Sequence, residues 1–228
     1  RKEVFFMYSF RNDYSEGAHP RVLQALTDTN LVQTCGYGVD PICDEARALI
    51  RTLCAAPDAA VHFLVGGTQT NMTVITALLA SYEAVIAAHT GHVNCHETGA
   101  IEATGHKVCT AYSPDGKVTP EMVESVLAIH ADGEEHMVAP KLVYISDTTE
   151  IGTVYTKAEL TALRQCCDAH DLLLFLDGAR LGSALTSPEN DLTLSDLAAL
   201  TDVFTIGGTK NGALFGEAVI MTVPCDHF

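Results

Sequence analysis

The sequence is poor in basic residues, long hydrophobic runs and paired cysteine motifs. It has 13 lysines and arginines against 29 aspartates and glutamates, a formal net charge of −16. So acidic a chain repels nucleic acids and anionic membranes, which are therefore not expected as partners. Every apolar run is shorter than the roughly 20 residues of a membrane span, and the first residues show no secretory pattern. We therefore expect a cytoplasmic protein.

The eight cysteines show no C-x-x-C pair and no regular spacing. Most lie in apolar segments, which is typical of reduced cysteines in a core. Cys166 and Cys167 are adjacent in the sequence and are not expected to bond to each other. Because histidines and cysteines do not fall at zinc-ligand spacings, no metal is expected.

Apolar residues make up 47% of the 228 residues, which is ample for a sizeable core. Short apolar segments, mostly separated by helix patterns, predict an α/β fold with about seven mostly parallel strands and helices on both faces. The last two strands have no helix between them, so one antiparallel edge strand is expected there. Two N-terminal helix patterns are expected to turn their leucines and isoleucines inward. The expected strands are residues 61–65, 85–88, 107–111, 142–146, 172–176, 203–206 and 218–223.

Polar residues collect where the predicted strands end. In doubly wound sheets, ligands bind beyond the carboxyl ends of the strands. A carboxylate, a guanidinium, a histidine, an amine and a glycine turn at these ends together indicate a site. The residues concerned are Gly67, Thr68, His92, Glu150, Asp177, Arg180 and Lys210.

Lys210 lies in the sequence G-G-T-K-N-G, directly after a buried strand. Glycine and Asn-Gly on either side indicate a tight turn. A lysine held there can be desolvated, and its neutral amine can then form a Schiff base. The alternative is a lysine that extends from a loop into solvent.

Asp177 follows five apolar residues, so its carboxylate needs a cationic partner. Arg180 is one candidate, and a protonated pyridine nitrogen of a cofactor is the other. The turn at Gly66, Gly67 and Thr68 joins a strand to a helix and can present backbone N–H groups to an anion. It lacks the full P-loop and dinucleotide motifs, so a plain tight turn remains the alternative.

Three segments carry a family resemblance: L-L-L-F-L-D-G-A-R-L-G-S-A-L, G-G-T-K-N-G and T-E-I-G-T-V-Y. From about Met7 to its end, the chain resembles the threonine aldolase group of fold type I pyridoxal-phosphate enzymes, in their β-eliminating-lyase branch. The resemblance implies a pyridoxal-phosphate-binding large domain at residues 61–228, after an N-terminal segment with helices at residues 1–60. It implies cleavage of L-threonine or L-allo-threonine to glycine and an aldehyde, in threonine catabolism and glycine biosynthesis.

The resemblance also implies roles for individual residues. Lys210 would hold pyridoxal 5′-phosphate, with Thr209 beside it, and Asp177 would pair with the ring nitrogen. Gly67 and Thr68 would lie at the phosphate, although the family usually has S-G-T where this chain has G-G-T.

The remaining implied roles concern the ring face and the substrate. His92, five residues before Glu97, fits the family's ring-stacking histidine and would act as a base, directly or through a water. Arg180 would lie near the cofactor phenolate and the substrate carboxylate. Asn12 and Tyr37 are further candidates for substrate contacts.

The resemblance further implies a homodimer or homotetramer with its site between subunits. It also implies a small C-terminal domain that is expected to be absent here, so the sequence is a fragment, an incomplete chain or a cofactor domain without that clamp. Two other functions stay open: a β-eliminating lyase acting on an aromatic or sulfur amino acid, and a noncatalytic cofactor-binding domain. A nucleotide-binding protein is disfavoured by the incomplete phosphate motifs.

Overall fold

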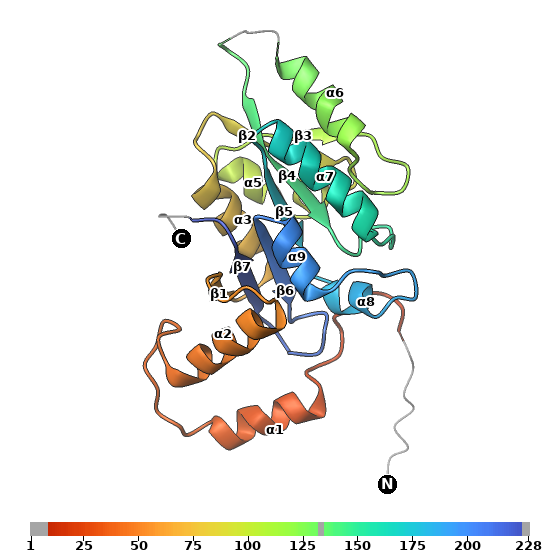
Figure 1. The fold of residues 1–228 in the computed structure, drawn as a ribbon. Coiled ribbons are helices and arrows are strands. Elements are labelled where there is room, and N and C mark those ends of the chain that lie inside the picture. Colours follow the sequence, from red (N-terminus) through yellow and green to blue (C-terminus); the bar gives the residue numbers. More distant parts are fainter. Residues whose placement is uncertain (1–8, 132–134, 225–228) are drawn as a thin grey trace.

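The computed structural model describes residues 9–131 and 135–224. Within these ranges, seven strands form one sheet in the order β1-β7-β6-β5-β4-β2-β3, as Figure 1 shows. The predicted α/β class is confirmed. The strands are β1 (Ala60–Leu64), β2 (Glu83–Ala88), β3 (Val108–Ala111), β4 (Ala139–Ser146), β5 (Leu173–Asp177), β6 (Val203–Gly207) and β7 (Glu217–Met221).

The strand β7 runs antiparallel to both of its neighbours, β6 and β1, while the other described pairs are parallel. An antiparallel strand was expected here and is present as β7. The prediction that this strand lies at the edge of the sheet was wrong, because β1 pairs with β7 on the side away from β6. The loop from β6 to β7 is too short for a crossover helix, so the chain must turn back antiparallel. β1 therefore runs parallel to β6, and its carboxyl end reaches the same edge of the sheet.

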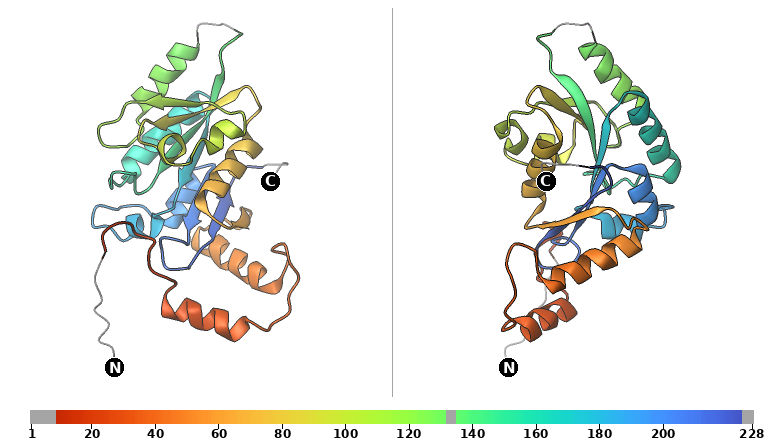
Figure 2. Two further views of the ribbon diagram at one scale, coloured as in Figure 1. Left: turned by 180° about the vertical axis from the view of Figure 1, so that it is seen from behind. Right: turned by 60° about the vertical axis from the view of Figure 1, so that its left-hand side comes forward.

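Helices cover both faces of the sheet, as the turned views in Figure 2 show. Side chains alternate along each strand, so neighbouring residues enter different cores. Leu174 and Leu176 of β5 join a core beneath α6, α7 and α9, whereas Phe175 joins a core beneath α3. The helices are α1 (Pro20–Thr29), α2 (Pro41–Leu53), α3 (Gly67–Leu78), α4 (His92–Cys95), α5 (Ala100–Ala103), α6 (Pro120–His130), α7 (Lys157–Ala169), α8 (Leu181–Leu185) and α9 (Leu194–Leu200).

The longer helices begin where local signals predict. Proline occupies the first turn of α1, α2 and α6, where its missing N–H costs nothing. Thr156 with Glu159 forms a capping box at the start of α7. The short helices α4, α5 and α8 were not predicted, since each is about one turn long. His92 is the first residue of α4.

The expected inward faces of α1 and α2 are not buried in this chain. Neither helix contains a buried residue, and Leu49 and Leu53 are 59% and 64% exposed. α2 contacts β1, whereas α1 lies beyond α2 at the margin of the molecule (Figure 1). The apolar periodicity predicted the two helices correctly. Their leucines, however, are not covered by other described residues of this chain.

The described cysteines are all free thiols, and those at 54, 109, 166 and 167 are buried, as the apolar context predicted. Cys225 lies outside the described residues. None of the described helices combines the length and the apolar character that a membrane span requires.

Candidate active site

One edge of the sheet receives the carboxyl ends of β1, β6, β5, β4 and β2. The turns after these strands therefore meet, as the doubly wound topology requires. The start of β7 lies at this edge too, because β7 is antiparallel to its neighbours. Residues more than a hundred positions apart in the sequence are thereby brought to one place.

A pocket of about 280 Å³ opens at this edge. That volume is near the lower limit for small-molecule sites, roughly 300–1,000 Å³, and suits a single small ring with its substituents. Seven predicted cofactor and catalytic residues line it, namely Gly67, Thr68, His92, Asp177, Arg180, Thr209 and Lys210.

The loop that carries Lys210 is fixed by hydrogen bonds from its own backbone and from Asn211. The Asn211 side chain donates to the carbonyl of Gly207 at 2.7 Å and to that of Ala179 at 3.2 Å. The Lys210 Nζ lies 6.0 Å from the ring centre of Tyr14. Within the described residues no carboxylate forms an ion pair with this ammonium group, so Lys210 is available to a ligand.

Asp177, at the end of β5, is 6% exposed. Its Oδ2 accepts hydrogen bonds from Asn71 Nδ2 at 2.9 Å and Tyr144 Oη at 2.6 Å, and its Oδ1 accepts one from the Ala179 N–H at 2.9 Å. Burial raises the pKa of Tyr144 well above its usual range, so the phenol keeps the proton that it donates. Of the two candidate partners of Asp177, Arg180 forms no ion pair with it in the described residues.

Arg180 instead pairs with Asp13. Its Nε and Nη2 donate to the two Asp13 oxygens at 2.5 and 3.0 Å. This bidentate pair raises the pKa of Arg180 and lowers the pKa of Asp13. The N-terminal segment is therefore attached to the rim of the pocket by an ion pair.

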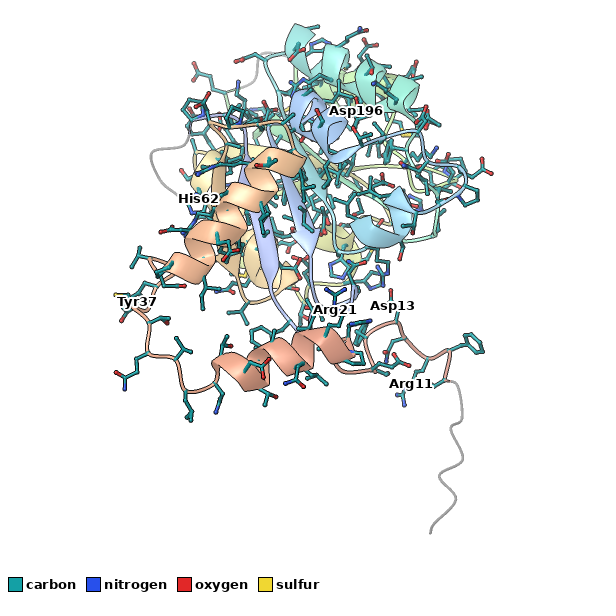
Figure 3. The ribbon with its side chains drawn as sticks, turned by 60° about the horizontal axis from the view of Figure 1, so that its bottom comes forward. Arg11, Asp13, Arg21, Tyr37, His62 and Asp196 are labelled. Atoms are coloured by element: carbon teal, nitrogen blue, oxygen red, sulfur yellow. The ribbon has the colours of Figure 1, made fainter. Side chains whose placement is uncertain are left out.

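Asn12 and Tyr37, the two weaker candidates for substrate contacts, do not line the pocket. Asn12 accepts hydrogen bonds from Tyr14 N–H and Ser15 Oγ within its own loop. Tyr37 is fully exposed, with φ of 65°, and Figure 3 shows it and Asp13 near opposite ends of α1. Neither residue reaches the pocket of its own chain.

His92 contacts a buried carboxylate. Its Nδ1 lies 2.8 Å from Glu97 Oε1, which also accepts a hydrogen bond from Asn71 Nδ2 at 2.7 Å. The hydrogen bond with Glu97 raises the pKa of His92. Asn71 thus joins the Asp177 and Glu97 carboxylates and fixes the distance between them.

The turn before α3 has the features of an anion site. α3 begins at Gly67, and Gly66 supplies no side-chain cap, so its first N–H groups are free to bind a ligand. A Cβ on Gly66 or Gly67 would have no heavy atom within 4 Å. These glycines leave room in front of the helix N-terminus.

Sequence reasoning missed several residues in and around the pocket, among them Asn71, Tyr144 and Glu217. Asn71 and Tyr144 lie within a predicted helix and a predicted strand, and nothing in the local sequence distinguishes them from the other residues of these elements. Glu217 had a signal, because an acidic residue directly precedes the apolar run of the last strand. Burial and the charge of Asp177 together, opposed by Lys210, raise the pKa of Glu217 to about 7.

Several known proteins are similar to this chain. The sequence profile described as beta-eliminating lyase matches residues 11–223. A low-specificity L-threonine aldolase of a Pseudomonas species is 35% identical over 220 residues, which cover 92% of this chain and 61% of that protein. The homologue from Pseudomonas aeruginosa, with the same name, is 33% identical over 213 residues.

A solved structure of Leishmania major threonine aldolase is 57% identical and superposes with a TM-score of 0.92, covering 95% of this chain and 63% of that one. A putative L-allo-threonine aldolase from Listeria monocytogenes, 19% identical with a TM-score of 0.66, shares the fold. The chain thus spans under two thirds of the length of these relatives. The pocket, the sheet and the profile together show that the chain belongs to the beta-eliminating lyase family.

Proposed function

We propose that the protein is a pyridoxal-phosphate-dependent carbon–carbon lyase that cleaves L-threonine and L-allo-threonine to glycine and an aldehyde. The observation that carries this proposal is the meeting of Lys210, Asp177 and His92 in one pocket. The names of the Pseudomonas and Leishmania relatives support the same reaction.

The residues present fit pyridoxal phosphate. Asp177 is a buried carboxylate that forms no ion pair with any cation of the described chain, so it can accept a protonated ring nitrogen. Lys210 offers an unpaired amine in the same pocket. Gly67 and Thr68 start α3 and offer N–H groups to a phosphate.

When bound, pyridoxal phosphate supplies an electrophilic carbon and an electron sink for the electrons of a bond broken at Cα. Lys210 provides the amine for attachment, and Asp177 keeps a proton on the ring nitrogen. Asn71 and Tyr144 hold the Asp177 carboxylate in place. Arg180, already oriented by Asp13, presents its remaining guanidinium donors at the pocket rim, where a substrate carboxylate would bind.

His92 would accept the proton of the substrate β-hydroxyl, directly or through a water. Its Nδ1 is engaged by Glu97, so Nε2 is the atom left for the substrate. A general base of this kind is typically worth about 10²–10⁴ in rate. Loss of His92 should therefore reduce turnover without abolishing cofactor binding.

The test compares Lys210→Ala, Asp177→Ala and His92→Ala, with the change Lys141→Ala at an ion-paired surface lysine as control. We expect the first two to abolish retro-aldol turnover, His92→Ala to lower kcat about 10²–10⁴-fold, and the control to behave like the parent. Borohydride reduction followed by peptide mass mapping should label Lys210. Full turnover and unchanged labelling in Lys210→Ala would disprove the assignment.

The reaction products separate the alternatives. Glycine and an aldehyde indicate aldol cleavage, whereas pyruvate and ammonia indicate β-elimination with the same cofactor residues. Cofactor binding without turnover would indicate a noncatalytic domain. The assay should use L-threonine and L-allo-threonine side by side, because the two differ only at Cβ.

We also propose that the protein works in the cytoplasm as a homodimer or homotetramer with its site at a subunit interface. Exposed apolar residues on α1 and α2 support self-association. Tyr37, exposed on the same segment, is then available to a neighbouring subunit, and Asn12 lies next to the ion-paired Asp13. The free cysteines agree with a reducing compartment.

A further inference from the structure

Three metal-ligating side chains of different kinds come together outside the pocket. They are Glu124 on α6, Cys166 on α7, and His170 directly after α7. One ligand atom of each lies within 4.8 Å of the other two. None of the three lines the pocket. Among the described residues, no other group of three or more histidine, cysteine, aspartate or glutamate side chains is close enough to hold an ion.

The two helices explain why these side chains meet. Cys166 and His170 are four residues apart, so they lie on the same face of α7, one turn from each other. The Cys166 Sγ lies 3.9 Å from the carbonyl oxygen of Pro120, which begins α6. Glu124 lies one helical turn after Pro120 on α6, and its carboxylate is close to the Cys166 sulfur and the His170 ring. A search for closely spaced cysteines and histidines misses such a set, because its third member comes from another helix.

The local charge favours a cation. Burial and, after it, the negative charges of Glu124 and Glu121 raise the pKa of Cys166, so the carboxylates that attract a cation also hold the proton that binding must displace. The site lies at the last turn of α7, the negative end of the helix dipole. The whole chain carries a net charge of −16, which adds a long-range attraction.

We propose that Glu124, Cys166 and His170 bind one Zn²⁺, with water as the fourth ligand. Thiolate, imidazole and carboxylate are the zinc ligands of proteins, at bond lengths of about 2.0–2.3 Å. Such bonds place ligand atoms roughly 3.3–3.8 Å apart in a tetrahedron, so small rotations of the exposed Glu124 and His170 complete the site. Binding releases the Cys166 thiol proton to solvent, and no electron is transferred.

The bound ion would join α6 to α7 across one face of the sheet. Its expected effect is on stability, because a ligand that binds only the folded chain shifts the unfolding equilibrium in proportion to its affinity. Cys166 is 8% exposed, so the thiolate is shielded from oxidation while the open position faces water.

The experiment titrates the purified, cofactor-loaded protein with Zn²⁺, and separately with Co²⁺, in a non-thiol reductant. We expect one equivalent to bind, a thiolate-to-Co²⁺ charge-transfer band to appear, and Zn²⁺ to raise the melting temperature. Cys166→Ser should abolish the band. His170→Gln and Glu124→Gln should each weaken Zn²⁺ binding by more than about 100-fold, the upper end of what the loss of a supporting group costs.

The chain offers a matched control in Cys109, whose Sγ lies 3.6 Å from His130 Nε2 without a third ligand in the described residues. Cys109→Ser should keep the band and the thermal shift. The proposal is overturned if no thiolate band forms, or if the band survives Cys166→Ser and is lost in Cys109→Ser. Retro-aldol turnover is measured in parallel. The zinc titration remains informative if turnover is absent, because the band and the melting temperature do not depend on it.

Discussion

At the scale of single residues, the site depends on side chains that hold other side chains. Asn71 donates to both Asp177 and Glu97, so one amide fixes the carboxylate that we propose for the ring nitrogen and the carboxylate that contacts His92. A buried amide with both donors satisfied is well defined in position. Most of the predicted site residues line one pocket, whereas Asn12 and Tyr37 do not, and the supporting partners were not predictable.

The first prediction concerns the His92–Glu97 pair. The hydrogen bond that Glu97 accepts from His92 raises the pKa of His92, so Glu97→Gln should lower this pKa. A raised histidine pKa stabilises the fold fully below the ordinary value, and this contribution is lost as the pH rises through the folded-state value. The variant should lose stability at acidic pH. The acidic limb of kcat/KM should also move to lower pH.

An NMR titration of the His92 ring gives the pKa of this histidine directly. The change Glu102→Gln on α5 removes an exposed carboxylate and serves as the matched control. An unchanged His92 titration in Glu97→Gln would contradict the assignment of Glu97 as the cause.

The second prediction concerns Asp147, which is 1% exposed. Burial raises its pKa from 3.8 to about 7. The stabilising contribution of the neutral carboxyl group is therefore complete below pH 3.8 and is lost as the pH rises to about 7. A shift of about three units corresponds to about 4 kcal/mol. Asp147→Asn keeps the acceptor for the Tyr155 N–H. Because asparagine does not ionise, the variant should not lose stability as the pH rises.

Urea unfolding at several pH values tests the prediction. The free energy of unfolding of Asp147→Asn, relative to the parent, should increase between pH 4 and pH 7 and then level off. A difference that is independent of pH would show that Asp147 is ionised throughout in the folded protein.

At the scale of elements, the motifs D-G-A-R and G-G-T-K pack against each other. A Cβ on Gly178 would lie 1.9 Å from the Thr205 carbonyl oxygen, and one on Gly207 would lie 2.7 Å from the Ala179 Cα. The Gly207 N–H also donates to the Gly178 carbonyl at 3.0 Å. These glycines permit the close approach of two strand ends, and that approach brings Asp177 and Lys210 to one pocket.

The third prediction follows from this contact. Gly178→Ala should separate β5 from β6 and lower the free energy of unfolding by about 1–3 kcal/mol, the usual cost of overpacking. Cofactor affinity should fall with it, because Asp177 precedes the glycine. Urea unfolding is the measurement. Gly17→Ala is the control, since its Cβ would meet nothing within 4 Å; an equal loss in both would refute the packing argument.

At the scale of the whole molecule, α1 and α2 lie at the margin of the two cores, and α2 touches one of them through the half-buried Ile50. Neither contributes a buried residue, although both carry an apolar face. We propose that residues 1–60 form a segment that contacts other subunits, while residues 61–228 form the cofactor domain. The exposed leucines are then interface residues. The helical spacing of these leucines is explained by their burial against a neighbouring subunit.

The fourth prediction tests this proposal. The double change Leu49→Lys and Leu53→Lys should convert the oligomer into a species of one chain, 24.3 kDa, because lysines do not tolerate burial in an apolar contact. Sedimentation equilibrium gives the mass. Ile129→Lys, at a residue 63% exposed on α6, is the control. A parent protein that is already monomeric would disprove the proposal.

The sequence by itself determined the class of the fold, the approximate strands and a set of candidate site residues, most of which line one pocket. Apolar runs, prolines and glycine turns act locally, and Asp177 and Lys210 are conspicuous because each follows a buried strand. Only the tertiary structure decided that β7 lies inside the sheet, that Arg180 pairs with Asp13, and that Asn71 joins two carboxylates. Those outcomes depend on which distant segments become neighbours, and no local pattern specifies that.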